Sequence, residues 1–230
     1  MTNADVATKK YQNFDMVVSK ANGILKSHES FSKVFKMANA VQAITVFLTD
    51  EEMAPIMELQ NRTVGFKTDK ENGYPLNVVR DCLIDAMVAG VVPVFNNFNI
   101  IGGRAYITKE GFFSLLNEIE ELEYYTVEPI TETFKQNGNV ADIKCIMTYK
   151  ISGFDPVVFE KMYKIKNHAQ YGSYDAVVGK CERKGRKDIY EKITGVELLD
   201  GDVETGLDPN KAVKPKEDAA NVENGLFNKD

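Results

Sequence analysis

The hydrophobic period of the sequence changes from helical to alternating near residue 98. Before this point apolar residues recur at helical spacing, as Phe14 and Val17 do, which is typical of an amphipathic helix. After it they alternate, as Ile143 and Cys145 do, which is typical of a half-buried strand. Helices followed by runs of antiparallel strands predict an α+β domain rather than a doubly wound α/β one.

The first half of the chain predicts helices at residues 5–26, 30–47 and about 50–60, followed by a buried helix ending before Pro93. Asn77 is the expected N-cap of that last helix and Gly90 its terminator. In the second helix we expect the apolar residues to pack inward. These residues are Phe31, Val34, Phe35 and Ala38.

The second half predicts two hairpins and two more helices. A Gly-Gly pair joins strands at 98–101 and 104–107, and Asn137-Gly138 joins strands at 126–136 and 140–151, because such pairs accept the positive φ of tight hairpin turns. Thr108 can cap a helix running to about residue 121. A third strand is expected within 154–165, and a last helix runs from Tyr174 to Gly195.

This last helix separates apolar from basic residues. Steps of three and four residues place Val178, Cys181, Gly185, Ile189 and Ile193 on one side, and Lys180, Arg183, Lys184 and Lys187 on the other. Cations at helical spacing can meet successive phosphates of a nucleic acid. An ordinary solvated helix face has the same composition, so both interpretations stay open.

Charge is segregated along the chain. The formal net charge is -6, yet residues 161–192 hold nine Lys/Arg against four Asp/Glu, and residues 200–230 hold eight acids against four lysines. Local field matters more for binding than net charge. We therefore expect one domain over 1–199, in which the helical N-terminal region (residues 1–75) could serve oligomerisation, and a disordered acidic tail over 200–230.

The tail ends in the apolar pair Leu226-Phe227. It could hook a partner, imitate a nucleic acid that competes for the basic face, or only aid solubility. No apolar run approaches the roughly 20 residues that span a bilayer, and the polar start lacks a signal-peptide core, so a soluble, cytoplasmic protein without membrane contact is expected.

Most enzyme classes lack their signatures. Cys82, Cys145 and Cys181 each lie in apolar segments and are expected to be reduced core residues. His28 and His168 are not at zinc-ligand spacing, and the Gly-Gly turn lacks the rest of a P-loop, so no cofactor is expected.

Two alternatives to nucleic-acid binding remain. Asp142 and Lys144 share one side of a strand, with Glu128 and Glu132 upstream, which is a pattern that a Mg²⁺-dependent nuclease could use. An open sheet face produces the same alternation without chemistry. The other alternative is a phage assembly or structural protein whose basic helix contacts an acidic neighbour.

The order of several short motifs resembles phage single-strand annealing proteins of the RecT/Redβ group. These motifs are a helix ending Ala89-Gly90-Val91-Val92-Pro93, a hairpin with Tyr106, a helix beginning Gly111-Phe112 with Leu115, antiparallel strands and a late basic helix. In that group a helix commonly ends in Gly, an aliphatic residue, any residue and Pro, and a later Lys/Arg-rich helix lines the DNA groove.

The resemblance implies a non-catalytic protein that binds single-stranded DNA and anneals complementary strands in phage recombination without ATP. It implies a ring or helical homo-oligomer in the bacterial cytoplasm, with Mg²⁺ at most a DNA counterion. A host single-strand-binding protein or a phage exonuclease could contact the acidic tail. The expected DNA-binding residues are Lys180, Arg183, Lys184, Arg186, Lys187, Arg104, Lys109 and Lys166, and Tyr106, Tyr171 and Tyr174 are candidates for base stacking.

Overall fold

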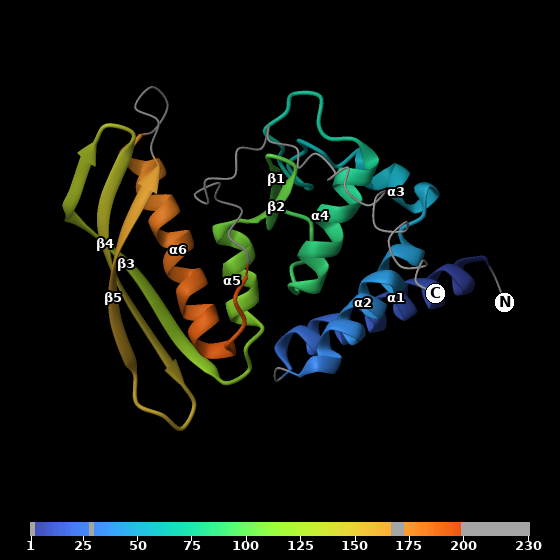
Figure 1. The fold of residues 1–230 in the computed structure, drawn as a ribbon, viewed down its shortest axis with the longest axis horizontal. Coiled ribbons are helices and arrows are strands. Elements are labelled where there is room, and N and C mark those ends of the chain that lie inside the picture. The colour runs from blue at the N-terminus through green and yellow to red at the C-terminus, as the bar shows by residue number, and fades with distance from the viewer. Residues whose placement is uncertain (1–2, 28–29, 167–172, 199–230) are drawn as a thin grey trace, which may run out of the picture.

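A computed structural model describes residues 3–27, 30–166 and 173–198 (Figure 1). Within these ranges it has six helices and two antiparallel sheets, which confirms the predicted α+β class. The helices are α1 (Asn3–Lys26), α2 (Phe31–Phe47), α3 (Asp50–Met57), α4 (Leu76–Val88), α5 (Lys109–Asn117) and α6 (Tyr174–Thr194). The strands are β1 (Phe98–Ile101), β2 (Arg104–Ile107), β3 (Leu122–Asn137), β4 (Val140–Ile151) and β5 (Val157–Lys166).

The elements lie in layers along the long axis of the molecule. The sheet β3-β4-β5 forms one end, α6 lies against one face of it, and α5 packs on the other side of α6 (Figure 1). The hairpin β1-β2 and α4 follow, and α1, α2 and α3 form the opposite end. The basic helix is therefore an interior layer, with neighbours on two sides.

Both predicted hairpins are present. Gly102 and Gly103 have φ values of 60° and 73°, and Ile101 pairs with Arg104 across them. Gly138 has a φ of 58° and turns β3 into β4. In the larger sheet β5 pairs with β4, and among the described strands it forms the edge.

The N-caps of two helices, α5 and α4, can be compared with the predicted ones. Thr108 caps α5 as predicted, since its Oγ1 accepts a hydrogen bond from the Gly111 amide at 3.1 Å. The prediction that Asn77 caps α4 is wrong, because Pro75 is the N-cap and the helix begins at Leu76. The proline ring fixes φ at -68°, a value that leads directly into a helix. No side chain caps this N-terminus.

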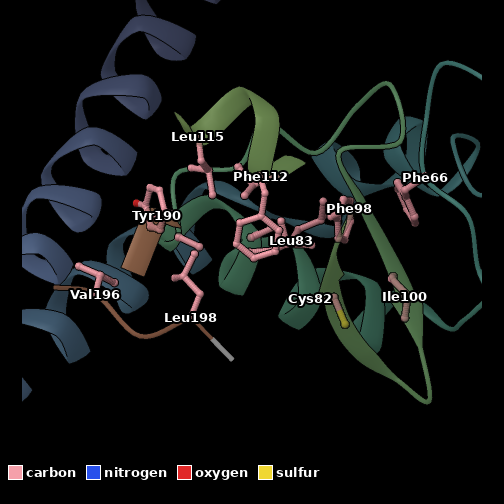
Figure 2. Packing of buried hydrophobic residues seen from close by; sticks show 14 of the residues in the cluster. Phe66, Cys82, Leu83, Phe98, Ile100, Phe112, Leu115, Tyr190, Val196 and Leu198 are labelled. Atoms are coloured by element: carbon pink, nitrogen blue, oxygen red, sulfur yellow. The ribbon is translucent and has the colours of Figure 1, made fainter. Parts of the chain in front are cut away.

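A continuous core joins the layers. Phe66, Phe98, Phe112 and Leu83 pack together between the hairpin, α4 and α5, and Tyr190 of α6 lies beside Leu115 (Figure 2). The rings of Phe66 and Phe98 are 4.9 Å apart. Val196 and Leu198, which follow α6, are buried in the same cluster. This cluster anchors the C-terminal end of α6.

The outer side of α2 does not follow the prediction. Phe31, Val34 and Phe35 were expected to pack inward, but they are 100%, 65% and 71% exposed. The helix is apolar on two sides, and the side that meets α1 and α4 carries Ala40 and Ile44. Spacing alone could not show which apolar side is covered.

The three cysteines are buried free thiols, as predicted. Among the helices in the described ranges, none combines the length and apolarity that a membrane crossing requires. His28, His168, Tyr171 and the acidic tail over 200–230 lie outside the described residues.

Candidate nucleic-acid interface

The predicted basic helix is present as α6, and local signals define both of its ends. Ser173 is the N-cap, and its Oγ accepts a hydrogen bond from the Ala176 amide at 3.2 Å. Gly195 follows the last turn with a φ of 68°, a conformation that glycine adopts at low cost. Between these caps α6 runs for 21 residues.

One side of α6 packs closely on the sheet. Cys181, Gly185 and Ile189 are buried there, as the sequence predicted. A Cβ at Gly185 would lie 2.5 Å from Cγ1 of Val127 in β3, so only a residue without a side chain fits this crossing. Helix and sheet approach each other through that glycine.

A second side of α6 packs on α5 and the small hairpin. Arg183 is only 3% exposed, and its guanidinium lies 4.4 Å from the ring centroid of Tyr106 in β2. The prediction that Arg183 stands in an outward basic row is therefore wrong. A cation stacked on an aromatic ring can be buried favourably, and the hairpin covers this face.

Arg186 also turns toward α5. Its Nη1 donates to the backbone oxygen of Lys109 at 2.9 Å, and its guanidinium lies 5.7 Å from the Phe113 ring centroid. The Lys109 ammonium is 3.5 Å from the Glu182 carboxylate. Lys109 and Arg186 therefore help to hold α5 against α6, on a different side from the lysines of the helix.

Three of the remaining cations of α6 form a strip between the two packed sides. We name Lys180, Lys184 and Lys187 the lysine strip; each is half-buried. The Lys180 ammonium donates to the backbone oxygen of Lys166, at the end of β5, at 2.9 Å. Because this bond reaches β5, the strip lies on the side of α6 that is next to the edge strand.

The edge strand contributes further cations. Lys161, Lys164 and Lys166 of β5 are exposed, and sequence reasoning had named only Lys166. The signal available was the spacing of lysines in the expected strand. We define the basic edge as the lysine strip together with Lys164 and Lys166. Lys164 and Lys166 stand on the outer face of the sheet, because the alternating residues Tyr163 and Ile165 are buried on the face that α6 covers.

Several acids lie near the basic edge, and two of them pair with its lysines or with Lys161. Asp188 accepts from the Lys161 ammonium at 2.7 Å and from the Tyr163 hydroxyl at 2.8 Å. Burial and the Asp188 charge raise the pKa of Tyr163 above its ordinary value, so this hydroxyl remains a donor. Glu191 lies 3.4 Å from the Lys187 ammonium. Asp142 stands opposite Lys164 in the sheet register, so cations and acids alternate along this side of the molecule.

Arg104 lies in a third place. It is exposed at the start of β2, directly after a turn whose Gly102 amide donates to the Asp69 carboxylate at 3.0 Å. The Gly103 amide donates to the Tyr74 hydroxyl at 2.9 Å, which ties this turn to the loop before α4. The predicted cations therefore fall at the basic edge, at the α5 contact and at this turn.

Of the three candidate stacking residues, Tyr106 lies under the Arg183 guanidinium and Tyr171 is outside the described residues. Tyr174, at the start of α6, is 41% exposed and meets Phe134 edge-on, with centroids 5.2 Å apart. Tyr174 is thus the candidate with the more accessible ring.

The nuclease pattern is not assembled. The Lys144 ammonium forms an ion pair with the Glu160 carboxylate at 2.6 Å, and Asp142 stands opposite Lys135 and Lys164 in the sheet register. Within the described ranges no group of three His, Cys, Asp or Glu side chains could hold a metal ion. The alternation on β4 is that of an open sheet face.

Comparison with known proteins identified no relative of this chain. No family model matches the chain, and neither a curated protein nor a solved structure matches it.

Proposed function

We propose that this protein binds single-stranded DNA along the basic edge and anneals complementary strands without ATP. The observation that carries the proposal is the position of Lys180, Lys184 and Lys187. They are half-buried on a side of α6 that lies between its two packed sides, next to an edge strand that adds Lys164 and Lys166. The resemblance of the motif order to the RecT/Redβ group supports the same function.

The chemistry needs charge and shape, without a catalytic group. Lysines act as point charges that attract phosphates of any sequence. A strand held by its phosphates keeps its base edges accessible, so a second strand is tested by base pairing. Specificity then comes from complementarity of the two strands, and the protein raises the chance that they meet.

The length of the site favours several copies on one strand. At about 1.5 Å per residue, the helix rises roughly 10 Å from Lys180 to Lys187, which matches about three phosphates of a stacked strand at about 3.4 Å each. One copy with so few phosphate contacts binds DNA weakly, whereas several copies bound to one strand gain avidity. We therefore propose a homo-oligomer, as a ring or a helical filament, that aligns the basic edges of its copies.

The remaining elements of the proposal follow from the resemblance. We infer action in the cytoplasm of a bacterial host during phage recombination, on single strands and the annealed duplex intermediate. A host single-strand-binding protein or a phage exonuclease would be recruited through the acidic tail. Magnesium would act only as a counterion of the DNA.

An annealing assay tests the proposed function. Two complementary fluorescent oligonucleotides are mixed with purified protein without ATP, at low and at moderate salt, and non-complementary strands serve as the control. We expect faster pairing that weakens as salt rises, because salt screens phosphate contacts. If pairing is not accelerated and no DNA is retained at low salt, the basic edge instead meets an acidic protein surface.

A further inference from the structure

Four asparagines of this chain precede a glycine, and the fold holds them in different ways. The pairs are Asn22-Gly23, Asn72-Gly73, Asn137-Gly138 and Asn224-Gly225. The asparagine side chain is thermolabile in water, and a following glycine, which has no Cβ, lets the next backbone nitrogen approach the side-chain amide carbon. The structure describes the first three pairs, so their reactivity can be compared.

The pair Asn137-Gly138 lies in the turn between β3 and β4. Asn137 pairs with Val140, which leaves Gly138 and Asn139 as a two-residue turn, and these turn residues are exposed. A Cβ at Gly138 would meet nothing within 4 Å, so no neighbour confines the turn. Within the described part of the chain the Gly138 amide takes part in no hydrogen bond. Its nitrogen is therefore accessible for reaction.

The pair Asn22-Gly23 is held in the interior of α1. A helix directs each amide to the carbonyl oxygen four residues earlier, so the Gly23 nitrogen points along the helix and away from the Asn22 side chain. That side chain is also engaged, because its Nδ2 donates to the backbone oxygen of Val88 at 3.2 Å. We expect this pair to react slowly in the folded protein.

The pair Asn72-Gly73 lies in a turn that hydrogen bonds hold on both sides. The Gly73 amide donates to the backbone oxygen of Lys70 at 3.0 Å, which engages the nitrogen that would react. The next amide, that of Tyr74, donates to Oε1 of Gln60 at 2.7 Å. This turn is exposed like the one at Asn137, but its backbone is tied to its neighbours.

Lysines surround Asn137 on the outer face of the larger sheet. Paired residues of neighbouring strands point to the same face. Asn137 pairs with Val140 and Val140 with Lys166, so Asn137 and Lys166 share this face, two strand spacings or about 10 Å apart. The next row of the same face consists of Lys135, Asp142 and Lys164. The lysines outnumber the acid, and a positive surplus favours loss of the Gly138 amide proton.

We propose that Asn137 is a modification site that deamidates spontaneously in the folded protein. The deprotonated Gly138 nitrogen forms a bond to Cγ of Asn137, the bond from Cγ to Nδ2 breaks, and Nδ2 leaves as ammonia with a proton taken from water. One water molecule then opens the cyclic imide to aspartate or isoaspartate. The net change is hydrolysis of an amide, so it requires no oxidant or reductant.

The product carries a new negative charge beside the basic edge. A carboxylate at position 137 stands on the same face as Lys166, at a separation close to the Debye length of about 10 Å at 0.1 M salt. It therefore lowers the positive potential that phosphates meet there. This consequence rests on the proposed function: a strand held along the basic edge binds more weakly as Asn137 is converted. The turn thus acts as a slow, one-way charge switch.

Peptide mapping of the aged full chain tests the modification site. The native protein is incubated at mildly alkaline pH and physiological temperature, and mass spectrometry follows the conversion of amide to carboxyl in each asparagine-containing peptide. We expect Asn137 to react several-fold faster than Asn22 and Asn72. Equal rates for the three, or an Asn137 that stays intact in the aged protein, would overturn the proposal.

The same incubation in urea separates the effect of the fold from that of the local sequence. Unfolding removes the helix around Asn22 and the hydrogen bonds around Asn72, so the three asparagines should then react at similar rates. A preference for Asn137 that persists unchanged in urea would show that the fold does not select it, and would contradict the structural argument.

Matched variants measure the effect of the new charge on DNA binding. Asn137→Asp carries the product charge in the turn beside the basic edge, and Asn72→Asp carries the same charge in the loop before α4. We expect Asn137→Asp to bind single-stranded DNA several-fold more weakly than Asn72→Asp at low salt, with a difference that shrinks as salt rises.

The outcomes of the two experiments are independent. Equal DNA affinities of the two variants, both with native circular dichroism, would overturn the charge switch. A wild type that retains no DNA would overturn the proposed function, and the switch with it, whereas the deamidation rates decide the modification site by themselves.

Discussion

The Lys180 ammonium donates to the backbone oxygen of Lys166 at 2.9 Å, which joins the first half of α6 to the end of the edge strand β5. This contact places cations from two separate segments along one rim. It also shows that a lysine of the lysine strip has a structural role.

Gly185 should be required at the crossing of α6 and the sheet. Gly185→Ala puts a Cβ 2.5 Å from Val127 Cγ1, and overpacking of this kind costs about 1–3 kcal/mol, which exceeds the helix propensity that alanine gains. The control is Gly179→Ala in the same helix, where a Cβ meets nothing within 4 Å and alanine should stabilise by about 0.5–1 kcal/mol. Urea unfolding measures both variants, and equal stabilities would contradict the close approach.

Arg183 and Lys184 are neighbours in sequence and should behave differently. Arg183→Ala removes a 3% exposed guanidinium stacked on Tyr106, so the free energy of unfolding should fall by about 1–3 kcal/mol. Lys184→Ala should change stability by less than about 0.5 kcal/mol and weaken DNA binding. Thermal melts and binding titrations on both variants make the comparison, and the reverse pattern would mean that the faces of α6 are misassigned.

Tyr190 should make the protein less stable at alkaline pH. Burial, assisted by the charge of Glu118, raises the pKa of Tyr190 from 10.0 to about 12. Above pH 10 the unfolded chain loses this proton and the folded chain keeps it, so stability falls as the pH rises from 10 toward 12. Tyr190→Phe should show a shallower alkaline loss in unfolding experiments.

Tyr190→Phe should not lower the free energy of unfolding at neutral pH. Among the described residues, the Tyr190 hydroxyl is buried without a hydrogen-bond partner, so removing it should be neutral or stabilising by about 1 kcal/mol. Tyr124→Phe, at a 44% exposed position, is the control. It should change neither the stability at pH 7 nor the loss of stability at alkaline pH. A clear loss of stability in Tyr190→Phe at pH 7 would show that the hydroxyl is satisfied.

Local signals explain why the hairpins and the Thr108 cap could be predicted. The pairs Gly102-Gly103 and Asn137-Gly138 require particular backbone angles, and alternating apolar residues flank them. The strand β3 was harder, since it begins at Leu122 rather than at 126. Its register shifts between Leu122 and Tyr124, so the alternation is interrupted where the strand starts.

The candidate site was only partly predictable. Hydrophobic period identified the sheet side of α6, but a buried cation such as Arg183 has the same sequence signature as a solvated one. Its burial depends on Tyr106, a residue 77 positions earlier that only the fold brings near. Likewise the period of α2 identified the side that carries Phe31 and Phe35 as apolar, but whether a neighbour covers that side is a property of the tertiary structure.

The most direct test of the proposed DNA binding along the basic edge is the salt dependence of single-stranded DNA binding by two triple variants. Lys164→Gln/Lys180→Gln/Lys184→Gln removes three cations of the basic edge. Lys70→Gln/Lys144→Gln/Lys150→Gln removes three elsewhere, including the partners of Glu160 and Glu123, and is the control of equal charge.

For single strands the slope of log affinity against log salt is about 0.7 per neutralised phosphate. We predict that the basic-edge variant binds more weakly and that its slope is smaller by up to about 2, while the control keeps the wild-type slope. Circular dichroism should be native for both variants. Equal slopes for the two variants, or a wild-type slope near zero, would contradict a strand held along the basic edge.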